Sequence, residues 1–389
     1  MKKVLVFTGS RANYSSTRAI MKAIMQHPKL ELQTVVGGSA LLDRYGNVTE
    51  LMQQDGIPVN SKFHMIIEGE TPSTMAKSTG VGIIDLSMIF ENLNPDIVLV
   101  VGDRFDVMAP VITAAYMNIV VAHTMGGEVS GTIDESIRHA ITKFSHIHFP
   151  ANNDAKHRII KMGENPEMVF NVGCPRMDLV NEKLLSFHRT EFNYKDFFTK
   201  NKGIGGIFNI SKKSFLLVSY HPVTTEYGSN LDAVKEVLYA LSELKMPTIM
   251  LWPNSDAGSN EISKGIRTFR EKNKTEWLHM FTNLPFDTYL RLMTMTDCLI
   301  GNSSSGIREG AFLGTPVVNI GSRQNRRLKG KNVIDVQPNK KDIINSIAKQ
   351  LKHKKYESEN IYGSGTAGLQ IAEILSNADV DDVQKIIEY

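Results

Sequence analysis

The sequence predicts an α/β protein built from two Rossmann-like, doubly wound domains. Three observations predict this fold class: short apolar, β-branched runs recur, amphipathic segments alternate with them, and the alternation occurs twice along the 389 residues. Continuous apolar runs of this length are typical of strands that are buried on both faces of a parallel sheet. Right-handed crossovers would then give two open sheets with helices on both faces.

The predicted elements follow one another in the same order in each half. Strands are expected at residues 4–7, 32–36, 97–101 and 119–122, and again at 215–219, 248–251, 298–300 and 316–320. Helices are expected at residues 16–26, 80–92, 134–144, 231–244, 288–296 and 306–313. We therefore predict domains at 1–175 and 176–367, followed by a helical tail at 368–389.

Composition excludes several classes of protein. There are 44 basic and 41 acidic residues, and the basic ones are scattered, which argues against a nucleic-acid partner. The two cysteines, Cys174 and Cys298, lie far apart and suggest neither a disulfide framework nor a zinc site, so a reducing cytoplasm fits best. The longest apolar stretch, residues 107–122, is interrupted by Pro110 and Asn118 and is shorter than the roughly 20 residues of a membrane span. We expect a cytoplasmic protein without a membrane segment.

The first strand-to-helix turn, residues 8–15, argues against two common cofactor classes. It has neither the G-x-G-x-x-G of a dinucleotide fold nor the G-K-[ST] of a P-loop, so nicotinamide cofactors and ATP are disfavoured. Arg11 and Ser15 lie where an anionic ligand would approach. An Arg11 that is only a solvated residue at a helix start is an equally good interpretation.

Carboxylates gather after two neighbouring strands of the first half. Asp103 and Arg104 follow one strand, and a loop with His123, Glu128 and Asp134 follows the next. Because ligands bind at the carboxyl ends of strands, these groups are candidates for proton abstraction and return. The alternative is structural, with Asp134 capping a helix and the other carboxylates ending loops.

Polar residues also follow the strands of the second half. The most informative run is Gly-Asn-Ser-Ser-Ser-Gly at residues 301–306, because small residues at a helix start present N–H groups and hydroxyls to a pyrophosphate. Glu309 follows one turn later and is placed to bind a ribose diol. The alternatives are a plain Gly/Ser turn, a solvated Glu309 and an ordinary strand-end histidine at His221.

Long motifs carry a resemblance to a known family. They are Gly-Asp-Arg-Phe at 102–105, Gly-Gly-Glu-Val-Ser-Gly-Thr-Ile-Asp at 126–134, Ser-Ile-Arg-His-Ala-Ile-Thr-Lys at 136–143, Trp-Pro-Asn at 252–254 and the run 301–324. The chain resembles the hydrolysing UDP-N-acetylglucosamine 2-epimerases, which make N-acetylmannosamine for sialic acid synthesis. The resemblance spans essentially the whole chain. It implies a GT-B-like fold with the active site in the interdomain cleft, a UDP-binding second domain, a tail that packs back on the first domain and a homo-oligomer, either dimer or tetramer.

The resemblance also implies roles for residues. Asp103, Glu128 and Asp134 would be acid/base carboxylates, and Arg104 and Arg138 their electrostatic partners. His221 would act in catalysis and in holding UDP. The remaining ligand-binding positions would be Arg11, Ser15, Asn254, Leu284, Phe286, Ser303, Ser304, Glu309 and Arg323.

One position departs from the family pattern. Many relatives have a glutamate two residues after the histidine that matches His123, whereas this chain has Met125. We expect Gly126 and Gly127 to take positive φ angles and to let Glu128 supply the missing carboxylate, with Met125 as an adaptable filler.

The reaction that the family implies is elimination followed by hydration. A carboxylate takes the C2 proton as UDP leaves C1, and water adds to the resulting 2-acetamidoglucal, so that neither a redox cofactor nor a metal is required. The sugar is N-acetylglucosamine or a 2,4-diacetamido-6-deoxy sugar of the legionaminic acid route. A GT-B glycosyltransferase and a catalytically silent UDP-sugar sensor are the rival functions.

Overall fold

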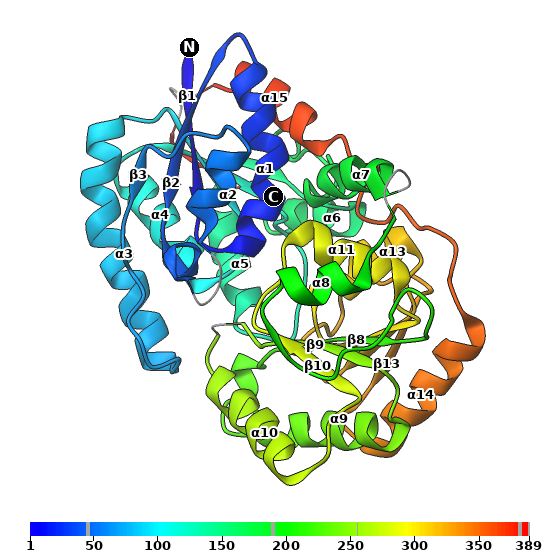
Figure 1. The fold of residues 1–389 in the computed structure, drawn as a ribbon. Helices are drawn as coiled ribbons and strands as arrows, with labels where there is room; N and C mark the ends of the chain where they lie inside the picture. Colours follow the sequence, from blue (N-terminus) through cyan, green and yellow to red (C-terminus); the bar gives the residue numbers. More distant parts are fainter. Residues whose placement is uncertain (44–46, 188–190, 255, 380–382, 388–389) are drawn as a thin grey trace. The chain divides into compact units, whose positions relative to one another are not determined.

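Two compact units make up the protein. The computed structural model describes residues 1–43, 47–187, 191–254, 256–379 and 383–387 (Figure 1). Unit 1 comprises Met1–Glu128, Ile133–Glu182 and Tyr362–Tyr389, and unit 2 comprises Val129–Thr132 and Lys183–Ile361.

Unit 1 contains a parallel sheet of six described strands in the order β3-β2-β1-β4-β5-β6. The strands are β1 (Lys2–Thr8), β2 (Leu30–Val36), β3 (Ser61–Lys62), β4 (Ile97–Val101), β5 (Val120–Thr124) and β6 (Ile147–Phe149). The order reverses between β1 and β4, so the carboxyl ends of these two strands form a topological switch point, where doubly wound folds bind ligands.

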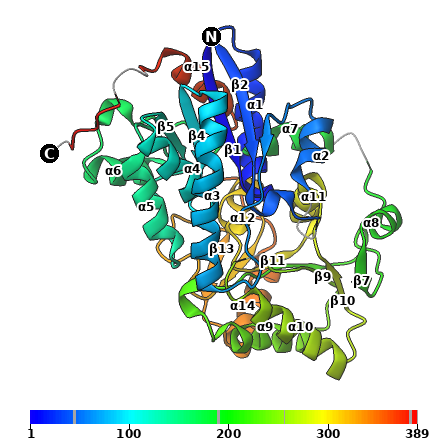
Figure 2. The same cartoon turned by 90° about the vertical axis from the view of Figure 1, so that its left-hand side faces the viewer.

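Helices cover both faces of the unit 1 sheet. They are α1 (Arg11–Gln26), α2 (Val48–Gln54), α3 (Pro72–Leu93), α4 (Phe105–Tyr116), α5 (Asp134–Phe144), α6 (Asn153–Lys161) and α15 (Ala367–Asn377), with 3₁₀ turns η1 (Gly38–Leu41) and η3 (Pro166–Met168). Alternate residues of β1 face opposite sides. Val4 and Val6 pack with Ile20 of α1 and Ile371 of α15, whereas Leu5 packs with the α3 side chains. The long helix α3 lies along α4 (Figure 2).

Unit 2 contains a sheet of seven described strands in the order β13-β12-β11-β8-β9-β10-β7. They are β7 (Gly203–Gly205), β8 (Leu216–Ser219), β9 (Thr248–Leu251), β10 (Leu278–Phe281), β11 (Cys298–Gly301), β12 (Val317–Ile320) and β13 (Val333–Val336). All pairs are parallel except β7 with β10 at the edge. β8 and β11 lie in the middle, and their buried apolar residues explain why both were evident from the sequence.

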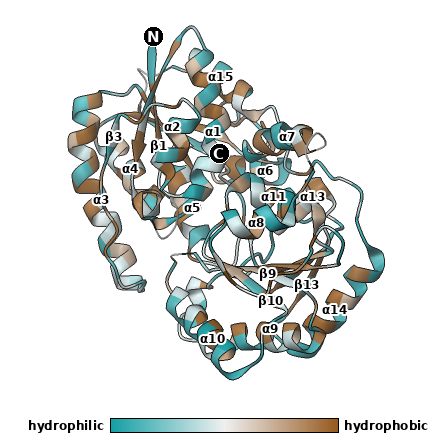
Figure 3. Ribbon diagram, viewed as in Figure 1, coloured by the Kyte–Doolittle hydropathy of each residue, from teal (hydrophilic) through white to brown (hydrophobic). Residues whose placement is uncertain are grey.

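The helices of unit 2 pack on both faces of its sheet. They are α8 (Tyr194–Lys200), η4 (Thr224–Glu226), α9 (Asn230–Leu244), α10 (Ser259–Lys272), α11 (Phe286–Met295), α12 (Ser304–Ile307), α13 (Glu309–Leu313) and α14 (Lys340–His353), while α7 (Arg176–Phe187) spans the boundary between the units. Val218 packs with α9 and α14, and Leu217 packs on the other face with Phe197 and Leu292. In Figure 3 the strands are mostly brown, and teal residues lie along α9, α10 and α14.

The prediction of two α/β domains is confirmed, but several predicted helices differ in their bounds. The helices expected at 16–26 and 80–92 begin earlier, at Arg11 and Pro72. The helix expected at 306–313 is interrupted at Arg308, whose φ of −87° and ψ of −70° separate α12 from α13. The tail is helical only to Asn377, where Ala378 adopts an extended conformation, so the expected helix through 389 was too long. Residues 380–382 and 388–389 of that prediction lie outside the described residues. Every helix in the described part of the chain is too short or too polar to cross a bilayer.

Candidate active site

An arginine joins two of the predicted carboxylate positions at the carboxyl edge of unit 1. Arg138, on the first turns of α5, is 1% exposed and donates to the Asp103 carboxylate and, at 2.6 Å, to the backbone carbonyl of Glu128. The Glu128 side chain is 3% exposed. Two segments that are far apart in the sequence are therefore fixed to one guanidinium, and the Asp103 bond is a charge-assisted hydrogen bond.

A neutral histidine supports the turn that carries Asp103. His123 on β5 is fully buried, and its Nε2 lies 2.8 Å from the carbonyl oxygen of Gly102, which has a φ of +80°. Burial lowers the pKa of His123 to about 3. The ring is therefore neutral at physiological pH, and its Nε2–H donates a hydrogen bond to the Gly102 carbonyl. His123 thus supports the Gly102 turn and does not act as a general acid.

The loop after β5 turns through two residues with positive φ. These are Met125, at +62°, and Gly127, at +71°, whereas Gly126 was expected to be one of the pair and is not. Met125 is 5% exposed, and its Sδ lies 3.8 Å from the Cys174 Sγ. Burial against this thiol compensates for a conformation that is costly for a non-glycine residue, and it agrees with a packing role for Met125.

A second arginine holds the same loop. Arg158 of α6 donates to the carbonyl of Gly127 and, at 2.8 Å, to the Asp154 carboxylate. A Cβ on Gly127 would lie 2.4 Å from the backbone oxygen of Ala155, so only glycine fits against α6 here. The two arginines thus bind consecutive carbonyls, those of Gly127 and Glu128, and fix the peptide that carries Glu128.

The other predicted residues of unit 1 lie at helix starts. Arg11 is the first residue of α1, and burial lowers the pKa of its guanidinium. Ser15 is buried, and its hydroxyl donates to the Arg11 carbonyl at 3.1 Å. Arg104 precedes α4, and Asp134 is the first residue of α5 and not its N-cap, which is Ile133.

A buried asparagine organises the carboxyl edge of unit 2. Asn302 follows β11 and is completely buried. Its Oδ1 accepts from the His221 backbone N–H at 2.7 Å, and its Nδ2 donates to the His221 carbonyl at 2.8 Å. The Asn302 carbonyl accepts from the side chains of Gln324 at 2.8 Å and Arg323 at 3.2 Å. Three strand-end loops are therefore joined through one residue.

The His221 ring is fixed by two further bonds. Its Nδ1 accepts from the Asn254 backbone N–H at 3.2 Å, so Nε2 carries the proton of the neutral ring and faces the Ser219 hydroxyl at 3.2 Å. The Asn254 side chain donates to Asp256 at 2.5 Å, and Arg323 lies 3.7 Å from the same carboxylate. The structure thus brings His221, Asn254 and Arg323 together at the carboxyl edge of unit 2.

Hydroxyl groups line the start of α12. The Ser303 Oγ accepts from the Ser305 backbone N–H at 3.4 Å, and the Ser305 Oγ lies 2.9 Å from the Ser303 Oγ and 2.7 Å from the Tyr289 hydroxyl. Glu309 is 1% exposed and begins α13. Burial raises the pKa of Tyr289 to about 12, and the Glu309 charge contributes. A buried Glu309 differs from the solvated residue of the alternative interpretation.

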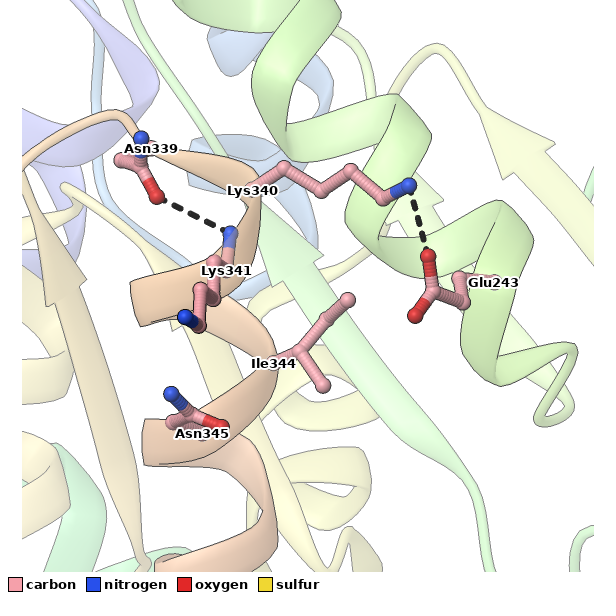
Figure 4. Close-up of a pocket in the computed structure, with 6 residues that line it drawn as sticks. All are labelled: Glu243, Asn339, Lys340, Lys341, Ile344 and Asn345. Atoms are coloured by element: carbon pink, nitrogen blue, oxygen red, sulfur yellow. Dashed lines mark hydrogen bonds and ion pairs between the residues drawn. The ribbon is translucent and has the colours of Figure 1, made fainter.

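The remaining predicted residues lie at or before the starts of α11 and α12. Ser304 begins α12, Leu284 is buried before α11, and Phe286 is its half-buried first residue. A pocket of about 380 Å³ lies between α9 and α14, where Lys340 pairs with Glu243 at 2.6 Å (Figure 4). Its lining residues are different from the predicted site residues. Across the described ranges, no group of three or more His, Cys, Asp or Glu side chains is arranged to hold a metal ion.

Sequence reasoning missed several residues that support the site. They are Asn302, Gln324, Tyr289, Asp256 and Arg158. Asn302 carried a detectable signal, because it directly follows a predicted strand. Tyr289 and Arg158 lie within helices, and no motif distinguishes them from other amphipathic residues.

Two doubly wound units with polar residues at the carboxyl ends of their strands are the arrangement in which open α/β sheets bind ligands. The family model described as UDP-N-acetylglucosamine 2-epimerase matches residues 22–376, and the chain belongs to this family.

Similar proteins agree with this membership. The chain is 34% identical to the UDP-N,N'-diacetylbacillosamine 2-epimerase (hydrolyzing) of Legionella pneumophila, over 96% of each chain. It is 29% identical to the UDP-N-acetylglucosamine 2-epimerase of Neisseria meningitidis, over 98% of this chain and 97% of the other. The crystal structure of UDP-GlcNAc 2-epimerase from Neisseria meningitidis bound to UDP-GlcNAc has a TM-score of 0.80 at 18% identity, over 97% of this chain and 100% of that one.

Proposed function

We propose that the chain is a hydrolysing 2-epimerase that converts a UDP-linked 2-acetamido sugar into UDP and the free 2-epimer. The observation that carries this proposal is the Arg138 bridge, which fixes the Asp103 carboxylate and the Glu128 peptide at the carboxyl edge of unit 1. In a member of this family, that arrangement would supply acid/base groups at the edge of the sheet where doubly wound folds bind ligands.

The reaction has two balanced steps. A carboxylate accepts the C2 proton while the C1–O bond breaks and its electron pair leaves with UDP, giving the 2-acetamidoglucal. Water then adds, with hydroxide on C1 and a proton on C2 from the opposite face. Asp103, Glu128 and Asp134 are the proposed proton carriers, Arg138 offsets the charge that develops, and Arg104 contacts the substrate.

UDP is proposed to bind at the carboxyl edge of unit 2. His221, Asn254, Ser303, Ser304 and Arg323 would bind the diphosphate with neutral and cationic groups, and Glu309 would accept from the ribose hydroxyls. The hydrogen bonds of Asn302 support this assignment, because they join the loops that carry His221 and Arg323. Leu284 and Phe286 would contact the uracil, and Arg11 and Ser15 would contact the substrate from unit 1.

Two sugars are candidates. UDP-N-acetylglucosamine, which would give N-acetylmannosamine, is named for the relative from Neisseria meningitidis. UDP-N,N'-diacetylbacillosamine, a 2,4-diacetamido-6-deoxy sugar, is favoured by the higher identity to the Legionella pneumophila relative.

The test is turnover without an acceptor. The purified full chain is incubated with each UDP-sugar, UDP release is followed, and the sugar product is identified by NMR. UDP together with the free 2-epimer supports the proposal. An intact UDP-linked epimer, binding without turnover, or turnover only with an acceptor would each refute it, and the last two outcomes would indicate a sensor or a glycosyltransferase.

A further inference from the structure

We infer that Asp106 is a positioning residue that holds the two arginine-bearing turns at the switch point of unit 1. Asp106 lies in the first turn of α4 and is completely buried. Acidic residues in the first turn of a helix are ordinarily exposed to water, where the helix dipole favours them. Burying a carboxylate is costly unless the surrounding groups stabilise it, so this position calls for a specific role.

The carboxylate packs against the turns after β1 and β2. A Cβ placed on Gly9 would lie 2.7 Å from Asp106 Oδ2, and a Cβ on Gly38 would lie 2.8 Å from the same oxygen. At Gly38 a Cβ would also lie 2.5 Å from the backbone oxygen of Gly9, so no side chain fits there, whereas a Cβ on Gly9 would force the Asp106 carboxylate or the Phe7 ring to move. The two turns are also joined to each other, because Ala40 N–H and the Ser39 hydroxyl donate to the Gly9 carbonyl at 3.1 and 3.3 Å.

The other carboxylate oxygen faces an arginine of the candidate site. Asp106 Oδ1 lies 3.5 Å from the Arg104 Nε, and the Arg104 guanidinium lies 5.5 Å from the centroid of the Phe105 ring. The Arg104 side chain is 16% exposed. An ion pair on one side and a ring on the other restrict the guanidinium to a narrow range of orientations.

One buried group therefore contacts both segments that carry proposed substrate arginines. Gly9 lies two residues before Arg11, and Arg104 is held directly. Asp106 does not need to touch the substrate to matter, because it fixes the turns from which Arg11 and Arg104 extend. The consequence for substrate binding rests on the proposed function, whereas the connection between the turns does not.

The test uses Asp106→Asn, which keeps the shape of the side chain and removes its charge. Asp96→Asn is the matched control, because Asp96 accepts the Lys3 backbone N–H at 2.7 Å just before β4, at the opposite edge of the same sheet. Two quantities are measured for both variants: hydrogen exchange of peptides covering residues 8–14 and 36–41, and the KM and kcat for the UDP-sugar.

For Asp106→Asn we expect exchange to accelerate about tenfold in both peptides, and KM to rise about tenfold with kcat changed by less than about threefold. Asp96→Asn should change neither. Unaltered exchange in the two peptides, or equal acceleration across the whole of unit 1, would overturn the inference, and unaltered KM in an active enzyme would overturn its substrate part.

Two further experiments distinguish failure of the proposed function from failure of the inference about Asp106. If wild-type protein neither binds nor turns over UDP-sugars, the proposed function fails and the exchange data alone decide the role of Asp106. If Asp106→Asn does not fold, Arg104→Gln replaces it: the inference then predicts a raised KM with unaltered exchange in residues 8–14, and an unaltered KM would contradict it.

Discussion

The carboxyl edges of the two units are built from different chemistry. In unit 1 the central groups are ionisable and fixed by charged partners, as in the Arg138 bridge to Asp103. In unit 2 the centre is the neutral amide of Asn302, bonded to the His221 backbone, with serine hydroxyls beside it. Carboxylates can carry protons, whereas a diphosphate is bound best by donors without negative charge. The comparison therefore supports the proposal that proton transfer takes place at the carboxyl edge of unit 1 and that UDP binds at the carboxyl edge of unit 2.

The largest effects should come from the carboxylates of unit 1. Asp103→Asn and Asp134→Asn are expected to lower turnover by about 100-fold or more while UDP affinity stays nearly unaltered, because an acid/base group is lost without loss of a UDP contact. Steady-state kinetics and UDP calorimetry measure the two quantities. Asp96→Asn, just before β4 at the opposite edge of the same sheet, is the control. Near-normal turnover in either variant would show that its carboxylate is structural.

The position of Glu128 gives a sharper test of the same edge. If its carboxylate replaces the glutamate that relatives have at position 125, Glu128→Gln should lower turnover about as much as Asp103→Asn. Met125→Leu should keep turnover, since Met125 packs on Cys174 and carries no proton. Normal turnover in Glu128→Gln would mean that Asp103 and Asp134 carry out the proton transfers without Glu128.

Substitutions at the carboxyl edge of unit 2 should instead weaken UDP binding. Glu309→Ala and Ser304→Ala are each expected to weaken UDP binding by roughly 1.5 to 3 kcal/mol, because charge-assisted hydrogen bonds would be lost. The dissociation constant of UDP is measured by calorimetry, with Glu243→Ala in the pocket of Figure 4 as the control. Unaltered UDP affinity in both site variants would contradict the proposal that UDP binds at the carboxyl edge of unit 2.

The smallest effect concerns acid stability, in which the units should also differ. Burial would raise the pKa of Glu164, but hydrogen bonds from His148, Lys143 and Lys385 outweigh it and lower the pKa to about 2. A depressed carboxyl pKa contributes stability that is complete above the ordinary value of 4.5 and is lost as the pH falls through about 2.

Between pH 5 and pH 2, the protection of unit 1 against exchange, corrected for the intrinsic exchange rate at each pH, should therefore fall more than the protection of unit 2. In Glu164→Gln this acid dependence should be reduced, and the variant should already be less stable at pH 5. Hydrogen exchange followed across the pH range measures both, and equal pH dependence in variant and wild type would contradict the role of Glu164.

How far the sequence could be interpreted depended on local patterns. Strands β4 and β9 were predicted with their observed bounds, because each is a continuous apolar run that ends at polar residues. Strands β6 and β10 were missed, since both are short and contain a histidine that interrupts the apolar run. The edge strand β7 is Gly-Ile-Gly, which has no strand signal and pairs only through the backbone of β10.

The candidate site was predictable where residues follow strands. Asp103, His221 and Asn254 were found in this way, and the structure places His221 and Asn254 in contact. A positive φ angle was predicted at Gly126, because glycine adopts such angles most readily. The structure has the positive φ angle at Met125 instead, where packing against Cys174 offsets its cost. The burial of Asp106 could not be predicted from the sequence either, because it depends on packing against Gly9 and Gly38, which are distant in the sequence.

Isotope labelling of the product tests the central claim most directly. The wild-type protein is incubated with each UDP-sugar in D₂O enriched in ¹⁸O, and the sugar product is analysed by NMR and mass spectrometry. Elimination and hydration predict a free 2-epimer that carries deuterium at C2 and ¹⁸O at C1, together with unlabelled UDP. A free sugar that keeps its original C2 proton and configuration would show simple hydrolysis and would contradict the account.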